Sequence, residues 1–184
     1  MIERKEALLL LEKYVRDDKL IKHSLAVEAI MNEVAATIDQ NTDLWALTGL
    51  LHDLDFEYTK QDPDKHAILT SQILEGMLPE IGINAIRAHN YMHTDYLPST
   101  QIDKMLIASD AVSGLIIATA LIIPSKKLAD VKFDTLKNKF KDNSFARGCN
   151  RSKIELCQDV GMEVDKFLEI SLKALQNISD KLDL

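Results

Sequence analysis

Residues 101–122 read QIDKMLIASDAVSGLIIATALI, the longest apolar pattern of helical spacing in the chain. Pro98 before this stretch and Pro124 after it limit the helix at both ends. Beyond the first turn, the one carboxylate in the stretch is Asp110, near its middle. A carboxylate buried in an apolar helix is costly unless a partner compensates its charge, and the nearest basic residue upstream, Lys104, lies off that face. The stretch therefore predicts a core helix whose carboxylate needs a partner, and a metal ion fits better than a salt bridge.

Apolar residues recur with helical spacing along almost the whole chain. Six further helices are predicted, over residues 5–16, 21–38, 43–54, 62–74, 83–92 and 151–178, with a loop at 55–61. Asp43 is the expected cap of one of these helices, and Asp62-Pro63 is the expected start of the next. Only 6 Gly, 4 Pro and 5% aromatic residues occur, and no strand pattern competes. The sequence therefore predicts an all-α helical bundle with a long C-terminal helix.

Length, composition and charge limit the class of protein. A chain of 184 residues, 46% hydrophobic and 28% charged, is expected to form one domain over residues 1–184. We expect a cytoplasmic protein without a membrane partner, because no apolar run reaches the roughly 20 residues of a membrane span or the length of a signal peptide. The net charge of −7 argues against nucleic acid as a partner. The sequence leaves the oligomeric state open.

Positive charge is concentrated in one segment of this acidic chain. Between Lys126 and Lys153, nine basic residues stand against three acidic ones, a surplus of nine minus three, about six positive charges. The segment is either a solvated surface or a place that attracts anions.

A second pair of polar residues also interrupts an apolar helix. His52 and Asp53 end the stretch LTGLL, residues 47–51, which has no polar side chain except one threonine hydroxyl. Burying an imidazole and a carboxylate there is costly unless something charged or hydrogen-bonding compensates. Because histidine and aspartate are both ligands for divalent transition metals, one cation at the helix end would compensate both.

Three short motifs occur in a familiar order: KHSLAV at 22–27, GLLHDL at 49–54 and IASDAV at 107–112. Together they resemble the H…HD…D signature of the HD superfamily of metal-dependent phosphohydrolases, over roughly residues 20–115. The resemblance implies an HD-domain helical bundle whose metal-binding core is that segment, followed by a basic connector and C-terminal helices at 124–184. Its metal ligands are the residues of the signature: His23, His52, Asp53 and Asp110.

Two more histidines fit a larger version of this pattern. His66 and His89 lie between the His-Asp pair and the last aspartate, where the two-metal branches of the superfamily carry two extra histidines. The resemblance then implies that Asp53 bridges two cations and that His66 and His89 hold the second. One or two divalent ions per chain are expected, and the sequence does not distinguish Fe, Mn, Zn, Ni, Co and Mg.

The neighbourhood of the signature departs from better-known members. Many members continue Ile-Gly-Lys after the His-Asp pair and carry a Gly-Tyr-Pro tripeptide, whereas this chain has LDFE at 54–57 and no such tripeptide. Cyclic-dinucleotide phosphodiesterase activity is therefore not carried over. Asp55 and Glu57 are either carboxylates that orient ligand imidazoles or simple loop residues. His93 follows His89 by one helical turn, and we predict that it faces the substrate.

The predicted reaction is hydrolysis of a phosphate ester or anhydride of a small molecule or nucleotide by a metal-activated water. Asp53 is the predicted catalytic residue, as metal ligand and as acceptor of the water's proton. Arg147 and Arg151, one turn apart near the start of the last predicted helix, are predicted to clamp the substrate phosphate, with Lys126 and Lys127 as a second anchor. The segment 124–149 also resembles that of small bacterial HD-family hydrolases.

Three alternatives stay open. The six ligands also resemble the di-iron site of myo-inositol oxygenase, an oxidoreductase of the same fold. A non-catalytic HD-fold signalling module is disfavoured because such modules typically lose ligands that this chain retains. A helical nucleic-acid binder that uses residues 126–153 is disfavoured by the acidic remainder of the chain.

Overall fold

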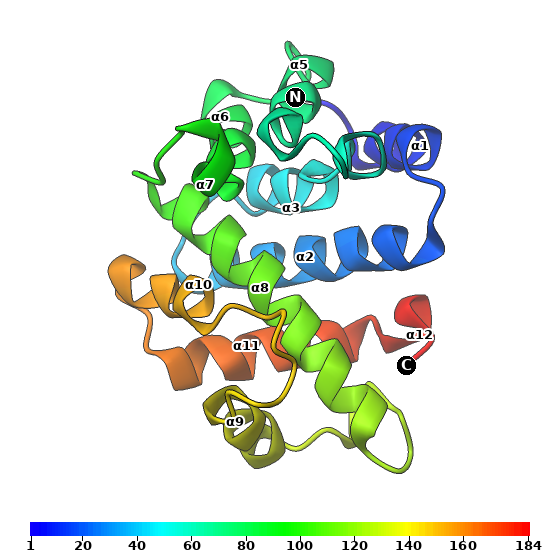
Figure 1. Cartoon of the computed structure of the whole chain (residues 1–184), viewed down its shortest axis with the longest axis vertical. Coiled ribbons are helices and arrows are strands. Elements are labelled where there is room, and N and C mark those ends of the chain that lie inside the picture. Colours follow the sequence, from blue (N-terminus) through cyan, green and yellow to red (C-terminus); the bar gives the residue numbers. More distant parts are fainter.

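The computed structural model describes all residues, 1–184, and contains helices and no strand, which confirms the all-α prediction. The longest helix, α8, spans Gln101–Ile122 and coincides with the predicted core helix. Its N-terminus is fixed by a capping box, in which the Thr100 hydroxyl accepts the Asp103 N–H and the Asp103 carboxylate accepts the Thr100 N–H. In Figure 1 α8 crosses the molecule diagonally between two groups of helices.

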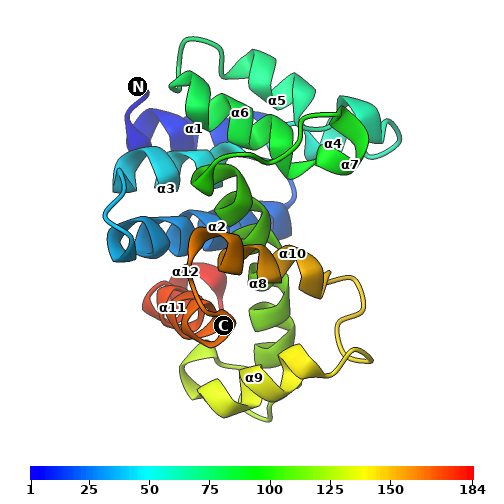
Figure 2. The same cartoon turned by 90° about the vertical axis from the view of Figure 1, so that its left-hand side faces the viewer.

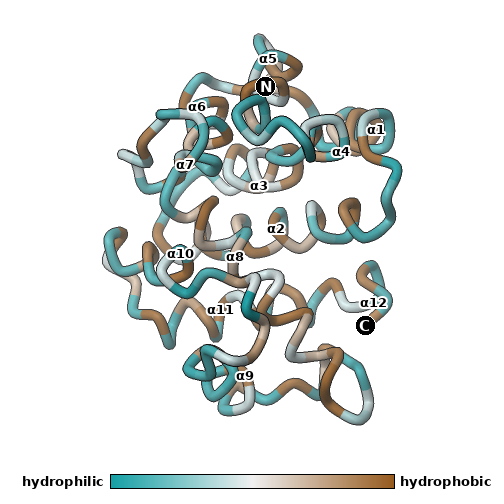
Figure 3. The backbone as a smooth tube through the Cα atoms, in the orientation of Figure 1, coloured by the Kyte–Doolittle hydropathy of each residue, from teal (hydrophilic) through white to brown (hydrophobic).

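The upper group and the lower group are each built from consecutive segments of the chain (Figures 1 and 2). Above α2 (Asp18–Thr37) lie α1 (Arg4–Tyr14), α3 (Thr42–Leu51), α4 (Phe56–Thr59), η1 (Pro63–Lys65), α5 (Ile68–Ile73), α6 (Glu80–His89) and α7 (Tyr91–Thr94). Below it lie η2 (Leu128–Asp130), α9 (Phe133–Lys141), α10 (Arg151–Glu155), η3 (Leu156–Val160), α11 (Val164–Asn177) and α12 (Ser179–Leu182). In Figure 3 much of α3 and α8 is hydrophobic, whereas the outer loops and α9 are largely hydrophilic.

One connected cluster of buried apolar side chains runs from Ala7 on α1 to Leu182 on α12. By length and composition alone, α8 is apolar enough to cross a bilayer. Most of that helix is buried against its neighbours, and core helices of globular proteins have the same composition. The apolar character of α8 is therefore accounted for by its position in the bundle.

A glycine sets the distance between α2 and α3. A Cβ atom added at Gly49 would lie 2.9 Å from the backbone oxygen of Val27, closer than real Cβ contacts come. We expect Gly49→Ala to lower the free energy of unfolding by about 2 kcal/mol, because backbone must move apart in a packed core. Urea denaturation measures this change. Gly148→Ala is the control, since no atom lies within 4 Å of the Cβ it would add.

Several predicted boundaries were wrong for local reasons. The helix predicted over 151–178 is divided into α10, η3 and α11, and Gly161, in the left-handed region with φ of 82°, separates the last two. The helix predicted over 83–92 stops at His89, and α7 is a separate turn. Asp62-Pro63 begins only the short η1. The helix does not continue into α5, because Ala67, with a φ of 74°, is not in a helical conformation.

Two smaller predictions about the first half of the chain also need correction. The cap of α3 is Asn41, whose side chain accepts the Leu44 N–H, and not Asp43. The predicted loop over 55–61 contains the one-turn helix α4.

Candidate metal centre

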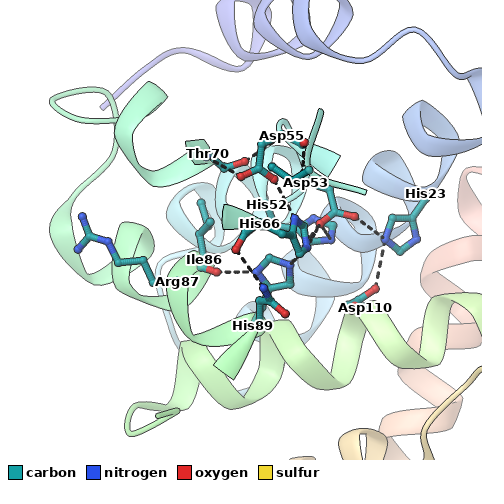
Figure 4. Close-up of polar contacts among 12 residues, drawn as sticks. His23, His52, Asp53, Asp55, His66, Thr70, Ile86, Arg87, His89 and Asp110 are labelled. Carbon is teal, nitrogen blue, oxygen red and sulfur yellow. Dashed lines mark hydrogen bonds and ion pairs between the residues drawn. The ribbon is translucent and has the colours of Figure 1, made fainter. Parts of the chain in front are cut away.

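The six residues predicted to bind metal converge at one point between the two groups of helices. Figure 4 shows His23, His52, Asp53, His66, His89 and Asp110 directed toward one another. They come from α2, the end of α3, the residue after η1, the last residue of α6 and the middle of α8. Residues that lie 87 positions apart in sequence (110 minus 23) therefore share one site.

Asp53 lies at the centre of this arrangement. Its Oδ1 is 3.4 Å from His52 Nε2, 3.4 Å from His66 Nε2 and 3.2 Å from His89 Nε2. Its Oδ2 is 3.8 Å from His23 Nε2. The same His23 nitrogen is 3.2 Å from Asp110 Oδ1, which brings the sixth residue into the cluster.

Helix ends orient two of the imidazoles. His52 Nδ1 donates to the backbone oxygen of Gly49 at 2.8 Å, and His89 Nδ1 donates to that of Ile86 at 2.5 Å. Both carbonyls belong to the last turn of a helix, α3 or α6, where they have no intrahelical partner. A proton held on Nδ1 leaves the lone pair on Nε2, so both imidazoles present a ligand nitrogen to Asp53.

Side chains orient the other two imidazoles. His66 Nδ1 donates to Asp55 Oδ1 at 2.8 Å, and the other oxygen of that buried carboxylate accepts the Thr70 N–H at 2.8 Å. His23 Nδ1 is 3.2 Å from the hydroxyl of Ser113, which gives its own proton to the backbone oxygen of Asp110. The hydroxyl therefore accepts from Nδ1. This common pattern, an oxygen on every Nδ1, is the one that prepares histidines for metal ligation.

Carboxylates that interact with ligand imidazoles are often as important as the ligands. We expect Asp55→Asn to weaken metal binding by about 10- to 100-fold, because the amide is a poorer acceptor for the His66 N–H and fixes its ring less firmly. Isothermal titration with Mn²⁺ or Zn²⁺ measures the affinity. Asp62→Asn is the control, since that carboxylate is exposed and pairs only with Lys65. Unchanged affinity in Asp55→Asn would contradict the orienting role.

The pKa values of several groups in the buried cluster are strongly shifted. Burial lowers the pKa of His52 to about 4, so this imidazole is neutral near pH 7. Burial opposes ionisation of Asp53, but its histidine neighbours outweigh burial and hold the pKa of Asp53 well below the usual value. Burial likewise opposes ionisation of Asp110, but the interaction with the His23 imidazole outweighs burial and lowers the pKa of Asp110 to about 2. Two carboxylates thus stay ionised beside a neutral imidazole.

The residues present fit a divalent cation. His52 Nε2 and Asp53 Oδ1 are buried without a hydrogen-bond partner, which is costly unless another group satisfies them. Two triads have ligand atoms within 4.8 Å of one another: His23, His52 and Asp53, and Asp53, His66 and His89. Imidazole nitrogens with carboxylate oxygens are a donor set for Zn, Fe, Mn, Co or Ni.

Protons compete with metal for these imidazoles. Burial lowers the pKa values of His23 and His89, but the adjacent carboxylates of Asp110 and Asp53 outweigh it, so both values lie above 6.5. Because a ligand imidazole must be neutral, metal affinity should already fall as the pH decreases toward 6.5, and fall further below it. Metal titrations at several pH values in two buffers of different ionisation enthalpy test this. Affinity that is constant from pH 8 to pH 6, with no proton release, would contradict it.

The cluster forms the floor of a pocket of about 300 Å³. The pocket is lined by Leu20, His23, Asp53, Phe56, His66, His89, Asn90, Asp110 and Lys153. Sequence reasoning missed Leu20, Phe56, Asn90 and Lys153 as site residues. For Lys153, no local pattern distinguishes it from the other basic residues of its segment.

The residues predicted to bind substrate do not line this pocket. Lys126 and Lys127 follow the end of α8 that is far from the cluster. The last residue of that helix, Ile122, is 12 residues from Asp110, which corresponds to about 18 Å along a helix, and the two lysines lie beyond it in the chain. The ring of His93 is 47% exposed and faces Asp64 at 3.8 Å, because the helix carrying His89 ends before it. Arg147 is exposed in the turn that precedes α10.

Arg151 has a different role from the predicted phosphate clamp. Its three guanidinium nitrogens donate to six backbone oxygens, those of Lys139, Phe140, Asp142, Phe145, Ala146 and Cys149, at 2.7–3.2 Å. The five N–H groups of an arginine are thereby all used. Arg151 holds the connector between α9 and α10 and has no donor left for a phosphate. Glu57 is also structural, since its carboxylate accepts the Arg16 N–H rather than orienting an imidazole.

Comparisons with known proteins agree with this geometry. The family model of the HD domain matches residues 20–115. A segment of 95 residues is 33% identical to ribonuclease Y of Geotalea uraniireducens (strain Rf4), and this match covers 50% of the chain but only 18% of the relative's length. The crystal structure of the L. monocytogenes phosphodiesterase PgpH HD domain has the same fold, with a TM-score of 0.54 at 16% identity over 92% of this chain and 98% of that one. Because the family model spans more than half of the chain and includes all six converging residues, the chain belongs to the HD domain family, the superfamily of metal-dependent phosphohydrolases.

Proposed function

We propose that the protein hydrolyses a phosphate ester or anhydride of a small molecule or nucleotide and uses two divalent cations. The observation that carries the proposal is the sharing of Asp53 by two ligand triads. One cation would be held by His23, His52, Asp53 and Asp110, and the other by Asp53, His66 and His89. A shared carboxylate between two sets of imidazoles is the arrangement that a two-metal site requires.

The residues of the pocket support hydrolysis at this site. A bound divalent cation makes water more acidic and neutralises charge on a phosphoryl oxygen. The low pKa of Asp53 keeps its carboxylate ionised near neutral pH, the form that would bind the cations, and we propose that the same carboxylate takes the proton of the attacking water. The side chains of His23 and Asp110 are 21% and 28% exposed, so a substrate can reach the site from solvent.

The test compares three properties of one preparation. Protein purified without oxygen is analysed for metal content, then assayed for phosphate release from nucleotides and generic phosphoesters, and for oxygen consumption. We expect about two metal ions per chain, phosphate release and no oxygen uptake. Oxygen uptake without phosphate release would replace the proposal with a di-iron oxygenase. Metal-free protein that stays inactive after metal is added would replace it with a non-catalytic module.

We also infer that residues 1–184 form one domain. The buried cluster includes side chains from α1, α2, α8 and α11, so the C-terminal helices share a core with the family segment. A single cooperative unfolding transition, coincident by circular dichroism and tryptophan fluorescence from Trp45, is expected. Two separate transitions would contradict this inference.

A further inference from the structure

Lys153 reaches the metal pocket from outside the segment that matches the HD family. It lies on α10, which is beside α8 in Figures 1 and 2, and its half-buried side chain lines the same pocket as Asp53 and Asp110. It is the only lysine or arginine among the nine lining residues. The C-terminal helices therefore contribute a positive charge that the family segment does not provide.

This lysine has no partner of its own. No carboxylate oxygen lies within 4.0 Å of its amino group, whereas Lys104, on the neighbouring α8, pairs with Asp159 at 3.2 Å. An ammonium group that lines a pocket and has no carboxylate partner is available to pair with an anion that enters the pocket. Its position beside the predicted metal ligands makes the substrate a suitable anion.

We infer that Lys153 binds the phosphate group of the substrate, and that this substrate is a small phosphate monoester. The inference rests on the proposed function. Two divalent cations with Asp53, Asp110 and Lys153 give the pocket four minus two plus one, a net charge of +3. A monoester carries close to two negative charges near pH 7, so it gains more from this field than a singly charged diester.

Size and surroundings favour a small substrate over a nucleic-acid strand. A pocket of about 300 Å³ is at the lower end of the range for small-molecule sites, and Leu20 and Phe56 give it an apolar wall for the organic part. A strand would need a row of free cations along its backbone. On α9, Lys137 pairs with Asp165 and Lys139 packs on the ring of Phe145, which leaves Lys141 as the one lysine of this helix without a partner and does not make a row.

The direct test is binding of inorganic phosphate to metal-loaded protein by calorimetry. We expect Lys153→Met to weaken phosphate binding about tenfold or more, with unchanged metal content and melting temperature, and Lys153→Arg to restore part of it. Lys126→Met is the matched control, since it removes the same charge beyond the far end of α8. Phosphate binding equal to wild type in Lys153→Met, or loss of metal from that variant, would overturn the inference.

A kinetic test separates this inference from the proposed function. With p-nitrophenyl phosphate we expect Lys153→Met to raise KM about tenfold with a smaller change in kcat, and the wild type to prefer this monoester to bis(p-nitrophenyl) phosphate. Preference for the diester, or an unchanged KM in Lys153→Met, would overturn the inference and leave the hydrolase proposal standing. If wild-type protein cleaves no phosphoester but binds phosphate through Lys153, the hydrolase proposal fails and Lys153 remains an anion-binding residue.

Discussion

Asp53→Ala is expected to reduce phosphate release by about a thousandfold or more and to remove nearly all bound metal. Both ligand triads contain this carboxylate, so its loss weakens both metal sites together. Metal ions in such sites supply several kcal/mol of transition-state stabilisation, and each 1.36 kcal/mol is a factor of ten in rate. Phosphate release and elemental analysis of the purified variant are the measurements.

Two further variants make this experiment decisive. Asp53→Asn keeps the volume of the side chain and removes its charge, so it should lose activity and metal while circular dichroism shows an intact fold. Asp62→Ala removes an exposed carboxylate that pairs only with Lys65, and it should behave as wild type. Turnover like that of wild type in Asp53→Asn would eliminate the proposed mechanism.

Arg151→Ala is expected to lower the free energy of unfolding by about 3 kcal/mol or more. The substitution removes the guanidinium donors to six carbonyl oxygens, two in the last turn of α9 and four in the connector to α10, and only those of Asp142 and Ala146 also accept a backbone N–H. Hydrogen bonds to a charged group contribute about 1.5–3 kcal/mol each, and partly buried acceptors left without donors add to the loss, although such contributions are not additive. Urea denaturation followed by circular dichroism measures the change.

Two control variants accompany Arg151→Ala: an alanine substitution of the nearby Arg147, and the conservative substitution Arg151→Lys. Arg147→Ala, in an exposed turn, should change stability by less than about 0.5 kcal/mol. Arg151→Lys should recover only part of the stability, because an ammonium group cannot reach carbonyls spread around a planar guanidinium. Unchanged stability with weaker phosphate binding in Arg151→Ala would restore the phosphate clamp that the sequence suggested.

How far the sequence predicts this fold depends on how each helix ends. The bounds of α8 were predicted because prolines flank it and its apolar pattern is uninterrupted. The break at Gly161 was missed, since the apolar pattern continues across it and one glycine is tolerated in many helices. Ala67 was missed for a stronger reason, because a positive φ at an alanine comes from tertiary packing and has no local signal.

The same distinction applies to the site. The order of the three motifs identified four of the converging residues, and the resemblance to two-metal members of the superfamily added His66 and His89. The substrate residues depend instead on how the C-terminal helices pack. Arg151 and Lys153 are two positions apart on α10, about 200° around the helix, so one serves the connector and the other the pocket. Charge and sequence proximity could not separate them.

Main-chain orientation of two imidazoles has a consequence for how this site tolerates sequence change. Every residue type has a carbonyl, so the acceptor that orients His89 survives substitution of Ile86, and a mutation at this buried position changes core packing without removing that acceptor. The orientation of His66 depends on the side chain of Asp55, and that of His23 on the side chain of Ser113. Few other residue types provide an acceptor at the same place. Of the four acceptors that orient the imidazoles, those of Asp55 and Ser113 are therefore the two that a side-chain substitution can remove directly.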